Sequence, residues 1–122
     1  MDKHDFAGIH IISEMYGIPD ELINNEYFLL NTLLQGTIKS GATIEGVLTK
    51  KFSPFGYSAI ILLSESHASI HTYPERHAIF VDAFTCGSNC RTERIIDEMI
   101  KRLRVKNHNT QIIQRGDSHG AL

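Results

Sequence analysis

The sequence lacks a hydrophobic run long enough to cross a membrane as a helix, which takes about 18 to 20 mostly apolar residues. It also lacks the beginning that is typical of a signal peptide, because its first residues, MDKHDF, are acidic and include a histidine. From these two absences we expect a cytoplasmic protein.

Cysteine is scarce, since Cys86 and Cys90 are the only two. Two cysteines are too few for the disulfide framework of a small secreted protein, and a reducing compartment keeps both as thiols. A surplus of charge is also missing: 12 lysines and arginines stand against 14 aspartates and glutamates, a formal net charge of −2. No strong field therefore favours nucleic acid or an anionic membrane. The one dense basic cluster falls at the end of an expected helix, where cations offset the helix dipole: Lys101, Arg102, Arg104 and Lys106.

Linkers, internal repeats and low-complexity stretches are absent as well, so the 122 residues are expected to form a single domain, 1–122. A chain of this length buries about two thirds of the surface that it exposes when unfolded. It is short for a deep, enclosed active site, which favours a site shared between subunits.

The apolar pattern that is present predicts an α+β fold. Six segments have the composition of strands: residues 9–16, 43–52, 57–63, 69–73, 78–84 and 111–114. In residues 43–52, Ile44, Val47 and Leu48 are expected to supply the apolar contacts. Residues 20–25 are expected to form a turn or a short helical segment.

Two longer helices are expected. The first has an apolar stripe at helical spacing and ends before Gly41, a suitable C-terminal cap; the stripe comprises Tyr27, Leu30, Leu34 and Ile38, widened by Phe28, Leu29 and Leu33. The second is capped by Ser88 or Asn89, and its apolar face comprises Ile95, Ile96, Met99, Ile100 and Leu103. This order predicts a two-layer sandwich: a largely antiparallel sheet with both helices on one face and its other face free to pair.

The residue types alone suggest two kinds of site, a zinc site and a hydrolase triad, but the surrounding sequence argues against both. His67, His71, His77 and Cys86 are the types that bind zinc, but no C-x-x-C or H-E-x-x-H arrangement accompanies them, so we expect no protein metal site. Likewise, Ser66, His71 and Glu75 could form a hydrolase triad, but no G-x-S-x-G elbow surrounds Ser66. Each residue taken singly is most often an ordinary sheet or turn residue.

Their joint arrangement carries more information. Residues 56–75 read GYSAIILLSESHASIHTYPE, and residues 80–87 read FVDAFTCG. Together these blocks resemble the signature of the short prokaryotic S-adenosylmethionine decarboxylase proenzymes. The resemblance continues more loosely upstream through SGATI at 40–44 and KFSPFG at 51–56, and so covers nearly the whole chain.

The resemblance implies that the chain cuts itself between Glu65 and Ser66, giving residues 1–65 (the beta chain) and residues 66–122 (the alpha chain). In the family, the serine attacks the preceding carbonyl and an N-to-O acyl shift produces an ester. Elimination and hydrolysis then leave a pyruvoyl group at the new N-terminus. This self-generated cofactor forms a Schiff base with the substrate amine and supplies the electron sink that decarboxylation needs.

The resemblance also assigns roles to single residues. Ser58 and His71 assist processing, since an imidazole titrates near neutral pH and can remove the serine α-proton. Cys86 is the general acid that returns a proton to the substrate, although a small buried thiol would otherwise be read as packing. Glu75 binds the ribose hydroxyls. Phe52 stacks on adenine, and core packing is an equally open interpretation of that residue.

Family members form two-fold dimers whose sheets face each other, and each active site draws on both subunits. By that pattern, Ser66 and Cys86 of one subunit meet Ser58, His71 and Glu75 of the other. Cys90 has no family counterpart and is assigned a structural role.

The substrate end matches the family less closely than the processing end. Residues 76–80, RHAIF, replace a common glycine-tyrosine-alanine stretch, and Ile9 stands where an arginine is common. The favoured function is the release of carbon dioxide from S-adenosylmethionine for spermidine and other polyamine biosynthesis. Decarboxylation of arginine or ornithine by the same machinery is the alternative, and an unprocessed, non-catalytic homologue is less favoured. Activation by putrescine or a metal ion, association beyond a dimer and the rate of processing stay open.

Overall fold

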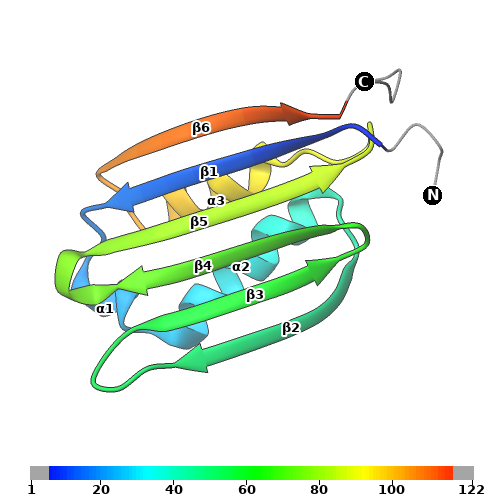
Figure 1. Cartoon of the computed structure of the whole chain (residues 1–122). Coiled ribbons are helices and arrows are strands. Elements are labelled where there is room, and N and C mark those ends of the chain that lie inside the picture. The colour runs from blue at the N-terminus through cyan, green and yellow to red at the C-terminus, as the bar shows by residue number, and fades with distance from the viewer. Residues whose placement is uncertain (1–5, 117–122) are drawn as a thin grey trace.

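The computed structural model describes residues 6–116, so residues 1–5 of the MDKHDF segment lie outside the described part. The chain forms one antiparallel sheet of six strands in the order β2-β3-β4-β5-β1-β6 (Figure 1). The strands are β1 Gly8–Tyr16, β2 Ile44–Lys51, β3 Tyr57–Leu63, β4 Ser66–Tyr73, β5 Ala78–Cys86 and β6 Asn107–Arg115. The helices are α1 Asp20–Ile23, α2 Glu26–Ser40 and α3 Glu93–Arg102, with a 3₁₀ turn, η1, at Pro74–Arg76.

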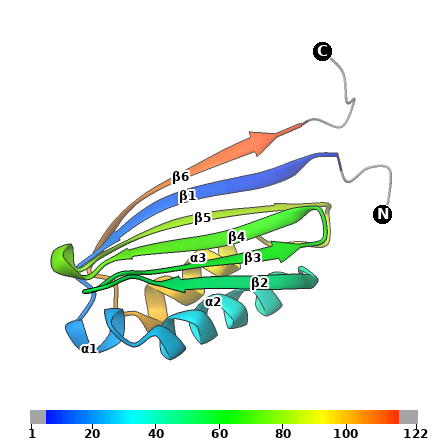
Figure 2. The same ribbon diagram turned by 60° about the horizontal axis from the view of Figure 1, so that its bottom comes forward.

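All the helices lie on one face of the sheet, as Figure 2 shows. The strands alternate accordingly, with one side chain in two buried against α2 and α3. In β3, for example, Ala59, Ile61 and Leu63 are buried, whereas Ile60 and Leu62 point to the other face and are exposed. The predicted α+β sandwich with one uncovered sheet face is confirmed.

The buried face of α2 is rotated from the predicted stripe. Leu29 and Leu33 form its apolar centre, but Tyr27 is 83% exposed and Ile38 also faces solvent. The reason is the packing of α2 against α3, which uses small residues. A Cβ on Gly36 would lie only 3.1 Å from the Cα of Ile95, so the close approach of the two helices selects this face.

The expected cap of the last helix is wrong. Neither Ser88 nor Asn89 caps α3, because the chain first turns at Gly87 and the helix begins after Thr92. In the segment between β5 and α3, the amide of Arg91 donates a hydrogen bond to the Ser40 carbonyl at the end of α2. Thr92 is buried, and its hydroxyl donates to the Ile9 carbonyl.

The uncovered face of the sheet is rich in apolar side chains. They come from strands across the sheet: Ile12, Leu48, Ile60, Leu62, Phe80 and Ile113 are all exposed. The expectation that Val47 and Leu48 supply core contacts is also wrong, since β2 is an edge strand and both side chains are exposed. Within residues 6–116, no helix has the length and apolar character needed to span a membrane.

Candidate active site

The hairpin between β3 and β4 carries the bond at which the resemblance places self-cleavage. Leu63 pairs with Ser66, so only Ser64 and Glu65 form the turn. Glu65 has a φ of 59°, a left-handed conformation that costs a residue with a Cβ about 1 kcal/mol or more. Hydrogen bonds of Ser64 hold the turn against the start of β2. The Ser64 amide donates to the Thr43 carbonyl at 3.0 Å, and the Ser64 hydroxyl donates to Glu45.

Cys86 contacts both groups that an acyl shift at this bond would join. Its backbone N–H donates to the Ser66 hydroxyl at 3.3 Å, and its thiol lies 3.6 Å from the same oxygen. The thiol also donates to the Glu65 carbonyl oxygen at 3.4 Å. β5 therefore places one residue beside the nucleophile and beside the carbonyl that it would attack.

These groups border a cavity of about 370 Å³ at the end of the sheet that holds the β3–β4 turn. Its wall is completed by the segment after α2 and by the connection that follows β5, including Asn89 and Cys90. Cys90 is expected to have a structural role only, because it has no counterpart in the family that the sequence resembles. The structure places it on the same cavity as Ser66 and Cys86.

The other predicted site residues gather at the opposite end of the sheet. Ser58 and His71 are directly paired on β3 and β4, and the hydroxyl is linked to Nδ1 by a hydrogen bond of 2.7 Å. They share a cavity of about 350 Å³ with Phe52 and Glu75. Phe52 is 47% exposed, so packing in the core does not explain that side chain.

The two groups are well separated within one chain. Ser66 begins β4 and His71 lies five residues further along it, which corresponds to about 17 Å in an extended strand. In Figure 1 the β3–β4 turn lies at the right-hand end of the sheet and the β2–β3 loop at the left-hand end. A single chain thus holds two separate groups, and neither contains the whole predicted set. We call them half-sites: one comprises Ser66 and Cys86, and the other comprises Ser58, His71, Phe52 and Glu75.

Comparison with known proteins identifies the family of the chain. The family model described as S-adenosylmethionine decarboxylase matches residues 9–116, which include both half-sites. The chain belongs to the S-adenosylmethionine decarboxylase family.

Several members of the S-adenosylmethionine decarboxylase family are similar over most of their length. A protein from Clostridium kluyveri named S-adenosylmethionine decarboxylase proenzyme is 38% identical over 109 residues, 89% of this chain and 86% of that one. A "proenzyme 2" of the same name from Bacillus cereus is 38% identical and covers 93% of each chain. The crystal structure of the adenosylmethionine decarboxylase from Aquifex aeolicus superposes with a TM-score of 0.84 at 29% identity, over 93% of each chain.

One polar cluster of this family member was not predicted from the sequence. His10, His67 and Asp82 converge on the uncovered face, although the histidine–cysteine set considered from the sequence does not come together. His71 instead pairs with Ser58, and the ring of His77 contacts the Ile18 carbonyl at 3.0 Å. Alternation along each strand could have shown on which face His10 and Asp82 lie. It could not have shown that their two strands are neighbours in the sheet.

Asp82 is the centre of this cluster. Partial burial by itself would raise the pKa of its carboxyl, but hydrogen bonds from His67 and His10, with their charges, outweigh that effect and lower the pKa. Asp82 is therefore an ionised acceptor at neutral pH.

Proposed function

We propose that this chain is the proenzyme of a pyruvoyl-dependent S-adenosylmethionine decarboxylase and that it cuts itself between Glu65 and Ser66. The observation that carries the proposal is the contact of Cys86 with both the Ser66 hydroxyl and the Glu65 carbonyl. Family membership supports a decarboxylase, and relatives named as proenzymes support self-processing.

The turn geometry favours the first processing step. The Ser66 oxygen attacks the Glu65 carbonyl carbon, the Glu65–Ser66 C–N bond breaks and an ester forms. A thiol donor on the carbonyl oxygen stabilises the negative charge that develops there. The left-handed backbone of Glu65 is a local strain that the rearrangement can release.

The later steps need a base for the Ser66 α-proton, and the Ser58–His71 pair is suited to this task. The hydroxyl fixes the orientation of the imidazole, whose other nitrogen is then available for the proton. Loss of that proton expels the Glu65 carboxylate. Water then replaces the nitrogen of the resulting enamine, so ammonia leaves and a pyruvoyl group remains.

The site around Ser66 fits such a group. A pyruvoyl carbonyl supplies the electron sink for carbon dioxide loss, and it would stand at the border of the 370 Å³ cavity. The Cys86 thiol is close to this position and can hold the proton that the substrate carbon takes up.

A two-fold dimer brings the half-sites together in this proposal. Because His71 lies about 17 Å along β4 from Ser66, the base that acts on Ser66 comes from a second copy. The uncovered apolar face supplies a surface on which two sheets can face each other. Each of the two sites then combines Ser66 and Cys86 of one chain with Ser58, His71, Glu75 and Phe52 of the other.

The second cavity favours S-adenosylmethionine as the substrate. Glu75 offers a carboxylate that can accept hydrogen bonds from two neighbouring hydroxyls, and exposed Phe52 offers a ring for a base and a nearby sulfonium. The cationic end of arginine or ornithine could also contact Glu75 and Phe52, but neither amino acid has the neighbouring hydroxyls and the base that would use the carboxylate and the ring together.

Measured carbon dioxide release tests the substrate. The specificity constant for S-adenosylmethionine should exceed those for arginine and ornithine by at least about a hundredfold, because a site built for hydroxyl contacts leaves them unmade with either amino acid. A higher constant for arginine or ornithine would refute the assignment but leave the processing chemistry intact.

Cys86→Ala should affect turnover more than cleavage. Loss of one hydrogen bond to the Glu65 carbonyl should slow cleavage by about fivefold, since the backbone donor to Ser66 remains. Loss of the proton donor should lower the rate of carbon dioxide release by at least about a hundredfold. Time courses of chain cleavage and assays of the fully cleaved protein separate the two effects.

Cys86→Ser is the matched control for this prediction. Its hydroxyl can still donate to the Glu65 carbonyl, so cleavage should return toward the native rate. Turnover should stay low, because a hydroxyl gives up its proton much less readily than a thiol. A cleaved Cys86→Ala protein with native turnover would exclude Cys86 as the proton donor.

A further inference from the structure

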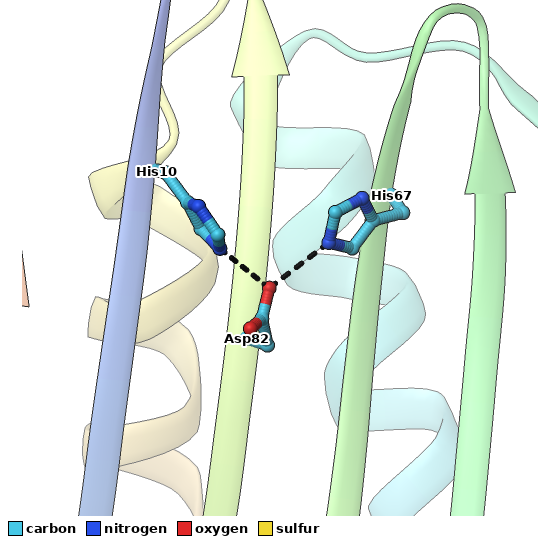
Figure 3. Close-up of side chains that lie close together, drawn as sticks. All are labelled: His10, His67 and Asp82. Atoms are coloured by element: carbon cyan, nitrogen blue, oxygen red, sulfur yellow. Dashed lines mark hydrogen bonds and ion pairs between the residues drawn. The ribbon is translucent and has the colours of Figure 1, made fainter. Parts of the chain in front are cut away.

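The cluster of His10, His67 and Asp82 lies outside both half-sites, and the proposed decarboxylase chemistry does not use it. Three neighbouring strands supply it, β1, β5 and β4 in that order across the sheet. His10 and His67 both pair with Phe84, one from each side, and Asp82 lies two residues before Phe84 on β5. The register therefore sets the three side chains around one point on the uncovered face (Figure 3).

The two imidazoles approach the same carboxylate oxygen. Nε2 of His10 lies 2.7 Å from Oδ1 of Asp82, and Nε2 of His67 lies 2.9 Å from it. The three candidate ligand atoms are all within 4.8 Å of one another. Figure 3 shows both rings turned toward the carboxylate.

We propose that His10, His67 and Asp82 bind a divalent transition-metal ion of the zinc class. Two imidazole nitrogens and a carboxylate oxygen are suitable ligands for Zn²⁺, whereas Mg²⁺ and Ca²⁺ prefer sites made of oxygen alone. The inference does not depend on the proposed decarboxylase function, because it concerns residues that neither half-site contains.

Binding requires a modest rearrangement of the side chains. Ligand atoms about 2.0 to 2.1 Å from a tetrahedral ion lie roughly 3.3 Å from one another. The two nitrogen–oxygen distances would therefore have to open by about half an ångström, and the two imidazole nitrogens, which lie within 4.8 Å of each other, would have to move toward the same separation. Side chains on hydrogen-bonded strands make such small changes without rearranging the backbone, and strands hold ligands more rigidly than loops do.

In a single chain the cluster is accessible, and in the proposed dimer it would lie on the face that the two sheets share. The exposed fractions of its side chains are 15% for His10, 40% for His67 and 41% for Asp82. The ring of Phe84 lies beside both imidazoles, with centroid distances of 5.9 and 6.2 Å, and limits their rotation. Three protein ligands leave one tetrahedral position for water or for a ligand from outside the chain.

One neighbouring charge opposes the ion. Nη1 of Arg115 lies 3.4 Å from Nδ1 of His10, and its guanidinium stacks 5.1 Å from the Phe84 ring centroid. An ion on Nε2 leaves the proton of His10 on Nδ1, so the guanidinium can no longer donate to this atom. Removal of the Arg115 charge should therefore strengthen metal binding, an effect opposite to that of removing a ligand.

Titration of the metal-stripped, full-length protein with Zn²⁺, followed by calorimetry, tests the proposal. We expect one Zn²⁺ per chain, and we expect Co²⁺ to bind with the intense visible absorption of a tetrahedral site. His67→Gln and Asp82→Asn should each weaken Zn²⁺ binding by at least tenfold. Arg115→Gln should tighten it by severalfold, and His108→Gln, a change on β6 outside the cluster, should leave it unaltered.

Thermal unfolding with and without Zn²⁺ provides a second measurement, because an ion that binds only the folded chain raises the melting temperature. The rise should be present in native protein and in His108→Gln, and lost in Asp82→Asn, which keeps hydrogen-bonding capacity and similar size. The proposal is overturned if native protein binds no stoichiometric Zn²⁺, or if Asp82→Asn and His67→Gln bind as native protein does. The cluster would then be a hydrogen-bonded cross-strand trio only.

Discussion

Ser66→Ala should leave the protein as one uncut chain of 13.7 kDa and should abolish carbon dioxide release from S-adenosylmethionine. Alanine has no oxygen to attack the Glu65 carbonyl, so neither the ester nor the pyruvoyl group can form. Native protein should instead give two chains, residues 1–65 and 66–122, with the nitrogen of the new N-terminus lost as ammonia. Intact-mass spectrometry resolves both the cleavage and this loss.

Ser69→Ala is the matched control. Ser69 lies on the same strand, β4, but it borders neither the cavity at Ser66 nor the cavity at His71. The control should cleave and turn over substrate like native protein. A native chain that folds but remains whole, or a Ser66→Ala chain that still cleaves at residue 65, would contradict self-processing at this bond.

The sequence predicted the fold well where the apolar pattern has a regular period. In α3 and at its C-cap, the predicted apolar positions Ile95, Ile96, Met99 and Leu103 are all buried, because they recur at the helical period. Prediction failed where tertiary packing decides between local options. The buried face of α2 depends on how closely α3 approaches Gly36, and nothing in residues 26–40 alone records the position of α3.

The same limit applies to the side-chain clusters. Ser58 and His71 can be expected to meet because β3 and β4 form a hairpin, in which consecutive strands pair. His10 and Asp82 are 72 residues apart, and they meet only because β1 enters the sheet beside β5. Strand order of this kind is set by the whole sheet, so a residue-by-residue reading finds the hairpin pair and misses the His10–Asp82 contact.

A mixture of two inactive variants should recover cleavage if the site is shared between chains. Ser66→Ala removes the nucleophile, and His71→Ala removes the proposed base, so each variant alone should stay uncut. In a mixed dimer, one site combines Ser66 of the His71→Ala chain with His71 of the Ser66→Ala chain and is complete. The other site lacks both residues. Random pairing of equal amounts makes about a quarter of all sites complete.

The identity of the chain that is cut makes this result decisive. Only the His71→Ala chain retains Ser66, so only that chain should be cleaved, and a mass tag on one variant distinguishes the two. If His71 acted within its own chain, that chain would lack its base in every pairing and would stay whole. Co-expression of the two variants, followed by intact-mass analysis, therefore separates a shared site from a site within one chain, even though Ser66 and His71 lie on the same strand, β4.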